Sequence, residues 1–498
     1  MTTTTTSRAG RAAASAPSVP AASIAPRALT GLGLAVLLVA YLPVNMTFGS
    51  VNLLAPAITA DLGVAVSGGQ LVLSAYTTTF AATLVVAGRL GDRYGRRRLL
   101  AAGLTAFAAL SVLAAFAPTL PALVALRAGL GVAAGLFTPQ VLSTIQATAP
   151  DRLRVLGVTL FTAVSGVATI AGQVLAGAVA GVAGDHLGWR AVQAATGVIA
   201  VAALLALRSV PESRSTAPLA LDLRGAGLLA AGLLLLVVPL TLGASTAWPP
   251  ALLGMLAAAG VVLALFARSQ RAAERRGELP VVPPRVLRTR VVRDGLVMTL
   301  LFFTGYGAFL YEFSALAQGA LGADAWGTVV LLLGFGGAFV ATALATPAIE
   351  RRTGRWTMTG AAVAQAAVLG GLALVVGSGH GGTTAALQPL LMALGAAQAL
   401  MYGPVLRTVL SRTPSWAAGV AGGLFTTLQQ LGLGLGVAVL GGLFQAVAAH
   451  AGVPDAGLPR GFVVAVGVQA VLALGFAALA ARTAAGRTGR DADLPAST

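Results

Sequence analysis

The stretch AGRLGDRYGRRRLL, from Ala87 to Leu100, holds five arginines and one aspartate in a chain of 498 residues of which only 9% are charged. The rest of the chain is apolar, with 57% hydrophobic residues, 63 glycines and a mean hydropathy of +0.87. A soluble domain needs a much more charged surface. The composition therefore predicts a membrane protein in which Ala87–Leu100 contains a charged loop.

Apolar runs of about 20 residues, the length that crosses a bilayer as a helix, occur fourteen times between charged or Pro/Gly-marked breaks. We predict an all-α integral membrane protein with fourteen transmembrane helices, arranged as two six-helix bundles plus two linker helices. The predicted organisation is a disordered tail over 1–27, an N-terminal bundle over 28–210, linker helices and a long loop over 211–293, a C-terminal bundle over 294–481 and a second tail over 482–498.

Arginine sets the predicted orientation. Twenty-nine of the 32 basic residues, all of them arginine, lie in the two tails and in alternate loops. Cytoplasmic loops carry such an excess, so both termini are predicted to be cytoplasmic. The absence of lysine beside abundant Ala and Gly indicates a bacterial source, and hence a multi-pass protein of the bacterial cytoplasmic membrane. No continuous basic face with aromatic platforms is present, which argues against nucleic-acid binding.

The longest of these loops, 268–293, contains RSQRAAERRGELPVVPPRVLRTR. This basic amphipathic segment is typical of sequences that lie on an anionic inner leaflet. A solvated linker is an equally good interpretation of it.

Two loops resemble each other across the chain. DRYGRRR from Asp92 has a degenerate echo in ERRTGR from Glu350, eight predicted spans later. Such an echo indicates an internal duplication, as in transporters with two six-helix bundles around a midplane cavity.

The stretch from Gly88 to Arg97 matches, in full, the loop motif Gly-x-Leu-Gly-Asp-Arg-x-Gly-Arg-Arg of the major facilitator superfamily. The chain resembles that superfamily, and within it the fourteen-span drug:proton antiporters of the EmrB/QacA type. Further segments carry the resemblance along nearly the whole chain: LRAGLGVAA from Leu126, GQVLAG from Gly172, VPESR from Val210, LDLRGAG from Leu221 and AGVAGGLFTTLQQLGLGLGVAVLG from Ala418.

The resemblance implies a secondary active transporter that exports hydrophobic or amphiphilic drugs or natural products by alternating access, driven by the proton gradient. No Walker loop, paired carboxylates or metal-ligand spacing is present in the sequence, so neither an ATP-driven pump, an enzyme nor a bound cofactor is predicted. The expected partners are the lipid bilayer, a small hydrophobic substrate and protons, with the chain acting as a monomer. The alternatives are a proton-coupled uptake symporter for a small organic solute and a transport-inactive membrane sensor.

The opening stretch is expected to form a conformational latch made of Gly88, Asp92, Arg93, Gly95 and Arg96. Asp92 precedes the third span, where its carboxylate can accept hydrogen bonds from a helix N-terminus and from arginine. The two glycines allow close approach and a tight turn. In the family, this loop fastens one half to the other in one access state and releases it in the other.

Two charged residues lie within predicted spans. Arg127 is placed in the fourth span, where a central arginine costs roughly 2.5 to 3.5 kcal/mol, and in relatives the corresponding arginine takes part in proton coupling. Glu312 is the only carboxylate well inside a span, and such a group can carry a proton. Snorkelling to the interface for Arg127, and a position at a vestibule rim for Glu312, are the structural alternatives.

The fifth span contains Gly166, Gly172 and Gly177, which are predicted to lie at the interface between the halves or to serve helix packing alone. The chain departs from the family at Gly172, where Gln173 follows instead of proline, and around Thr47, where many relatives carry an aspartate. Both departures argue against lipophilic dications as substrates and favour a neutral or weakly charged amphiphile. Polar residues proposed to line the substrate cavity are Asn45, Asn52, Tyr76, Gln140, Gln173, Tyr306, Gln318, Tyr402, Gln429 and Gln430.

Overall fold

The computed structural model describes residues 28–214, 222–243, 246, 248–278, 280–379, 384–411, 418–450 and 454–485. All regular elements in these ranges are helices, as the composition predicts. The predicted tail 1–27 lies outside the described residues, as does most of the tail predicted over 482–498.

The N-terminal bundle contains five continuous helices: α1 (Gly31–Asp61), α2 (Ser67–Tyr94), α3 (Arg96–Ala115), α4 (Leu120–Thr148) and α5 (Asp151–Ala206), followed by a short 3₁₀ turn η1 (Leu207–Ser209). α5 holds two spans, Asp151–Gly184 and His186–Ser209. They meet at Gly184, whose φ of 72° breaks the helical geometry without an intervening loop.

The linker comprises α6 (Leu223–Leu242), α7 (Pro250–Arg275) and the short α8 (Pro284–Arg288). α6 contacts α7 and also lies against both bundles, on α2 and α13. Its Thr241 donates a hydrogen bond of 3.2 Å to Ser74 of α2, and its residues Leu229, Leu233 and Val237 form an apolar cluster with Ala81 and Leu431. The linker pair is thus packed against both bundles.

The C-terminal bundle contains α9 (Arg290–Gly319), α10 (Ala325–Thr353), η3 (Gly354–Trp356), α11 (Thr357–Gly377), α12 (Thr384–Ser411), α13 (Ala418–Leu435), the π-helical η6 (Gly436–Leu440), α14 (Gly441–Ala449) and α15 (Pro454–Ala485). A Cβ at Gly436 would lie 2.1 Å from the carbonyl oxygen of Thr304. The π-helical turn therefore begins where two backbones touch.

Twelve helices of the described ranges are long and apolar enough to cross a membrane, or thirteen with the bent α2. One of the twelve, Ala325–Gly377, contains both α10 and α11, which meet at Gly354 with a φ of 58°. The described helices are compatible with the fourteen predicted spans.

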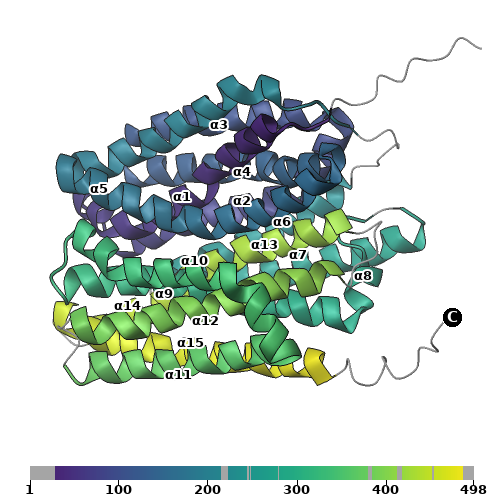
Figure 1. Ribbon diagram of the computed structural model, residues 1–498. Coiled ribbons are helices and arrows are strands. Elements are labelled where there is room, and N and C mark those ends of the chain that lie inside the picture. The colour runs from purple at the N-terminus through teal and green to yellow at the C-terminus, as the bar shows by residue number, and fades with distance from the viewer. Residues whose placement is uncertain are drawn as a thin grey trace, which may run out of the picture.

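The two bundles lie side by side (Figure 1), with α8 and the C-terminal end of α15 at the same end of the molecule. We call this end, which also carries the α2–α3 turn, the arginine-rich end. Between α5 and α10, a Cβ at Gly177 would lie 2.7 Å from Val329, and one at Gly336 2.8 Å from Ile170. Near the arginine-rich end, by contrast, Val155 of α5 is 71% exposed. These two contacts between α5 and α10 thus lie away from the arginine-rich end.

Candidate functional site

Arg127 lies wholly inside the N-terminal bundle, with 0% of its surface exposed. Its Nη1 donates a hydrogen bond of 2.8 Å to Thr47 Oγ1 of α1, and its Nε donates one of 3.3 Å to the Val72 carbonyl of α2. The guanidinium stands 4.6 Å from the ring centroid of Tyr76. Nη2 has no hydrogen-bond partner among the described residues. Arg127 therefore does not snorkel; it is held by neutral groups of two helices, α1 and α2.

Glu312 is also 0% exposed, between α9 and α15 of the C-terminal bundle. Gln469 donates a hydrogen bond of 2.6 Å to its Oε2, while Oε1 has no partner among the described residues. The carboxyl is thus enclosed, and the vestibule-rim position weighed from the sequence is wrong. It and Arg127 belong to different bundles, and no ion pair joins them.

A polar cluster joins the two bundles near the middle of the helices. Asn45 donates to the hydroxyl of Tyr41 (3.3 Å) and to Ser165 Oγ (3.4 Å). Tyr402 of α12 donates to the same Ser165 oxygen at 3.3 Å. Among the predicted cavity residues, the structure therefore brings Asn45 and Tyr402 together. It does so through Ser165 and Tyr41, which the sequence analysis missed.

An aromatic cluster continues from Tyr402 into the C-terminal bundle. The ring of Tyr402 stacks on Phe302 and Phe425, with centroid distances of 6.1 and 6.3 Å. Tyr306 stacks on Phe302 at 6.1 Å. Rings that pack in this way present flat apolar surface beside a polar tip. Tyr306 and Tyr402 belong to this cluster, whereas its phenylalanines carried no signal in the sequence.

A cavity of about 460 Å³ lies between α1, α9, α14 and α15, away from the arginine-rich end. Asn52 lines it, and neither atom of its buried side-chain amide has a hydrogen-bond partner among the described residues. Gln318 lines it too and donates a hydrogen bond of 2.9 Å to the Leu53 carbonyl across the bundle interface. Asn52 and Gln318 thus meet in one cavity, together with Tyr311 and Gln445.

The other predicted cavity residues are buried in the helix packing. Tyr76 donates to the Val44 carbonyl at 2.8 Å, and Gln140 donates to the Ala87 carbonyl at 2.7 Å. Both hydrogen bonds stay within the N-terminal bundle. Three further glutamines are buried, each apart from the 460 Å³ cavity: Gln173, Gln429 and Gln430.

The predicted latch residues bind within the N-terminal bundle, while Arg89 of the same stretch donates to the Pro280 carbonyl of the linker segment. Asp92 accepts hydrogen bonds from Arg96 at 2.6 and 3.1 Å, and Arg96 also donates to Ser213 at the end of the sixth span. Gly95 has a φ of 106° at the turn, while a Cβ at Gly88 would meet nothing within 4 Å. Arg93 stands over the ring of Tyr94. In this structure none of these residues makes a described hydrogen bond or ion pair with the C-terminal bundle.

The N-terminus of α3 is bound by Glu212, a residue that the sequence analysis left without a role. Its Oε1 accepts hydrogen bonds of 3.0 Å from Arg97 N and 3.1 Å from Ser213 N. A Cβ at Gly95 would lie 3.0 Å from the same oxygen. The segment VPESR from Val210 thus supplies the carboxylate that we had expected from Asp92 at this helix end.

The fifth-span glycines separate into two sets. A Cβ at Gly166 would lie 2.7 Å from Phe339, and Gly177 faces Val329, so both lie at the bundle interface. Gly172 does not, because a Cβ there would lie 2.2 Å from the Met46 carbonyl of α1. Gly166 and Gly177 are eleven residues apart, about three turns, whereas Gly172 is about 240° round the helix from Gly166. Its prediction as an interface glycine is wrong.

Two helical bundles around buried polar and charged groups, with a pair of linker helices, define a membrane transporter. Residues 37–437 match the family model of the Major Facilitator Superfamily. The chain belongs to this superfamily, which confirms the membership predicted from the loop motif.

Curated relatives cover most of the chain. The probable actinorhodin transporter of Streptomyces coelicolor is 33% identical over 397 residues, covering 79% of this chain and 68% of the relative. The puromycin resistance protein pur8 of Streptomyces alboniger is 34% identical over 420 residues, with 82% and 80% covered. The cephamycin export protein CmcT of Amycolatopsis lactamdurans is 33% identical over 402 residues, with 77% and 79% covered.

Among solved structures, the peptide transporter POT in complex with sulfate aligns with a TM-score of 0.65 at 16% identity. The alignment covers 92% of this chain and 95% of the other. At this identity, the likeness concerns the fold.

Proposed function

We propose that the chain is a proton-coupled exporter of hydrophobic or amphiphilic drugs or natural products, in the drug:proton antiporter branch of the superfamily. The observation that carries the proposal is the identity of 33 to 34% over about four fifths of the chain to proteins named for antibiotic transport, resistance and export. The residues that we propose to bind substrate and proton are among the buried groups described above.

The proposed substrate is a neutral or weakly charged amphiphile with aromatic rings. The cluster of Phe302, Tyr402 and Phe425 offers ring faces, and the adjacent Tyr41 and Asn45 offer hydroxyl and amide groups. Few polar groups within an apolar wall suit a range of such compounds. The N-terminal bundle holds Arg127 beside Thr47 rather than beside a carboxylate, so it has little to attract a dication.

In this proposal Glu312 binds and releases the proton, while the guanidinium of Arg127 supplies a fixed positive charge inside the N-terminal bundle. Glu312 has a single hydrogen-bond donor and no cation beside it in the described structure, so its charge is compensated only when water or another group approaches. One proton that moves down 100 mV supplies roughly 2.3 kcal/mol, and the proposed energy source is therefore the proton gradient, without a bound cofactor.

The proposed location is the bacterial cytoplasmic membrane, with both termini and the arginine-rich end in the cytoplasm and the chain acting as a monomer. The arginine distribution supports this orientation. In it, the contact of Gly177 with Val329 and the 460 Å³ cavity both lie toward the exterior.

Inverted membrane vesicles with an imposed pH gradient test the proposal. Wild type is expected to accumulate fluorescent aromatic amphiphiles, and collapse of the gradient is expected to abolish accumulation. Glu312→Gln should lose gradient-driven accumulation yet still bind substrate, measured as a thermal shift of the purified protein. Arg152→Gln, a change of an exposed residue at the arginine-rich end, is the control. Undiminished pumping by Glu312→Gln would refute the proton-carrying role, and absence of any gradient-driven transport by wild type would refute export.

A further inference from the structure

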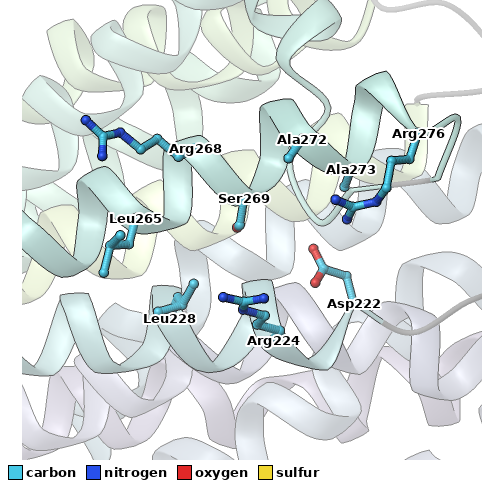
Figure 2. A pocket seen from close by; sticks show the side chains of 9 residues that line it. All are labelled: Asp222, Arg224, Leu228, Leu265, Arg268, Ser269, Ala272, Ala273 and Arg276. Atoms are coloured by element: carbon cyan, nitrogen blue, oxygen red, sulfur yellow. The ribbon is translucent and has the colours of Figure 1, made fainter.

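A second pocket lies on the linker helices, outside the proposed transport path. It has a volume of about 300 Å³ and is formed by the inner ends of α6 and α7. Figure 2 shows Arg224 reaching from α6 into the space between the two helices, with Arg276 directed toward that space from α7. Ser269 and Asp222 complete its polar lining. Arg268 lines it as well, with its guanidinium directed away from Arg224 (Figure 2).

The pocket carries uncompensated positive charge, since three arginines line it with one carboxylate. That carboxylate, Asp222, accepts hydrogen bonds from Gly225 N at 2.7 Å and from Gln270 Nε2 at 2.8 Å, both of them neutral donors. Arg224 and Arg268 make no ion pair within the described ranges. Two strong cationic donors are therefore available to an anion.

Arg276 is only partly available. Its Nε and Nη2 bind the two carboxylate oxygens of Glu278 at 2.8 and 2.9 Å. These hydrogen bonds hold the pKa of the exposed Glu278 below its usual value, so the pair persists at neutral pH. The charge that remains for a ligand thus comes from Arg224 and Arg268.

The opposite wall of the pocket is apolar and continues along the membrane. Leu228 and Leu265 line it, and Leu265 is 46% exposed. Farther along α7, Val261 is 61% exposed and Leu253 52%. A ligand with an anionic head at Arg224 could therefore extend a hydrocarbon chain along α7, whereas a soluble anion would leave this apolar surface uncovered.

We propose that the pocket between α6 and α7 binds the phosphate of one anionic phospholipid from the cytoplasmic leaflet. Arg224 is its ligand within the pocket, the exposed side chain of Arg268 turns toward the phosphate on binding, and Leu228 and Leu265 lie against its acyl chain. Basic pockets between helices on this membrane face suit such headgroups. Because α6 contacts both α2 and α13, the bound lipid fixes the linker at the junction of the two bundles.

Lipid binding to the full-length purified protein tests this site directly. The probe is fluorescent phosphatidylglycerol titrated into protein in neutral detergent, with phosphatidylcholine of the same chains as the zwitterionic comparison. Wild type is expected to prefer phosphatidylglycerol, and Arg224→Gln/Arg268→Gln to bind it about tenfold or more weakly. The matched control Arg152→Gln/Arg208→Gln removes two exposed arginines from the same face and should bind like wild type. Thermal unfolding of each variant verifies that it is folded.

Two further arms distinguish the source of the anion. Glycerol 3-phosphate at millimolar concentration should displace the probe poorly, and Leu265→Ser should weaken phosphatidylglycerol binding. Equal binding by Arg224→Gln/Arg268→Gln and wild type would overturn the site. Full displacement of the probe by glycerol 3-phosphate, together with unchanged phosphatidylglycerol binding by Leu265→Ser, would show that the site binds a soluble anion and not a lipid. These readouts do not depend on transport, so they stand apart from the test of export.

Discussion

Arg127 of α4 donates a hydrogen bond of 2.8 Å to Thr47 Oγ1 of α1. The buried cation of the N-terminal bundle is consequently held by a hydroxyl, a carbonyl and an aromatic ring instead of an ion pair. Two predictions follow from the pairing, one for stability and one for substrate choice.

Thr47→Val keeps the shape of the side chain and removes the acceptor. A second donor of Arg127 then lacks a partner, and we expect the free energy of unfolding to fall by about 1 to 3 kcal/mol. Thermal unfolding in detergent measures the loss. Thr138→Val is the matched control, because the buried Thr138 hydroxyl has no partner among the described residues. Equal unfolding temperatures for the two variants would show that the Thr47 hydrogen bond contributes nothing.

Thr47→Asp places a carboxylate beside Arg127. Inside an apolar bundle, this negative charge should favour the binding of cationic substrates. We expect wild type to transport lipophilic dications such as methyl viologen poorly and this variant to gain their transport. Uptake of the dication into inverted vesicles, relative to a neutral dye, measures the change. A wild type that already prefers dications would contradict the proposed substrate class.

The fifth-span glycines predict three different outcomes for one kind of substitution. Gly177→Val adds bulk against Val329, so we expect slower transport with little change in the fold. Gly172→Ala meets the Met46 carbonyl and should lower the unfolding temperature. Gly181→Ala, at a position where a Cβ meets nothing within 4 Å, should be neutral or stabilising by up to about 1 kcal/mol. Transport and unfolding temperature, measured side by side on the three variants, separate these effects.

Glu212→Ala removes the carboxylate that accepts hydrogen bonds from Arg97 N and Ser213 N. Loss of such a helix-terminal acceptor costs about 0.5 to 2 kcal/mol. We expect faster hydrogen exchange in the first turn of α3 and a lower unfolding temperature. Asp151→Ala, whose side chain is 94% exposed at the start of α5, is the control and should change little. Unaltered exchange in α3 would mean that Glu212 does not stabilise this turn.

Two substitutions of Tyr402 separate the contribution of its ring to substrate binding from that of its hydroxyl. Tyr402→Phe removes the hydrogen bond to Ser165 but keeps the stacking on Phe302 and Phe425, so the KM for an aromatic substrate should change little. Tyr402→Leu removes the ring, and we expect its KM to rise several-fold, since aromatic pairs contribute about 0.5 to 1.5 kcal/mol each. Similar KM values for both variants would argue against stacking of the substrate here.

Much of the fold follows from local features of the sequence. Apolar length predicts the helices, and the loop motif at Gly88–Arg97 predicts the family. The sequence predicts less well where a helix is interrupted or continues into the next span. The two predicted spans that end near Val182 and begin at Trp189 are joined at Gly184 without a loop, and the thirteenth span contains the π-helical turn at Gly436–Leu440. Both features depend on backbone conformation at single glycines, which occur throughout this chain.

The sequence pattern predicts the charged residues of the site but not the polar residues that bind them. Arg127 and Glu312 stand out because charge is rare within spans. Thr47, Ser165 and Glu212 have no such signal, because hydroxyls are common in membrane helices and Glu212 follows a span. Their roles come from contacts between residues eighty or more positions apart. Gly172 was assigned to the interface by composition, while helical rotation turns it toward α1.

The guanidinium of Arg127 is fixed in one bundle and the carboxyl of Glu312 in the other, both away from solvent. When the bundles tilt against each other, these groups shift within the electric field of the membrane, where each elementary charge carried across 100 mV is worth about 2.3 kcal/mol. The conformational equilibrium of the transporter should therefore depend on voltage, and a voltage step should produce a measurable displacement current even in the absence of substrate.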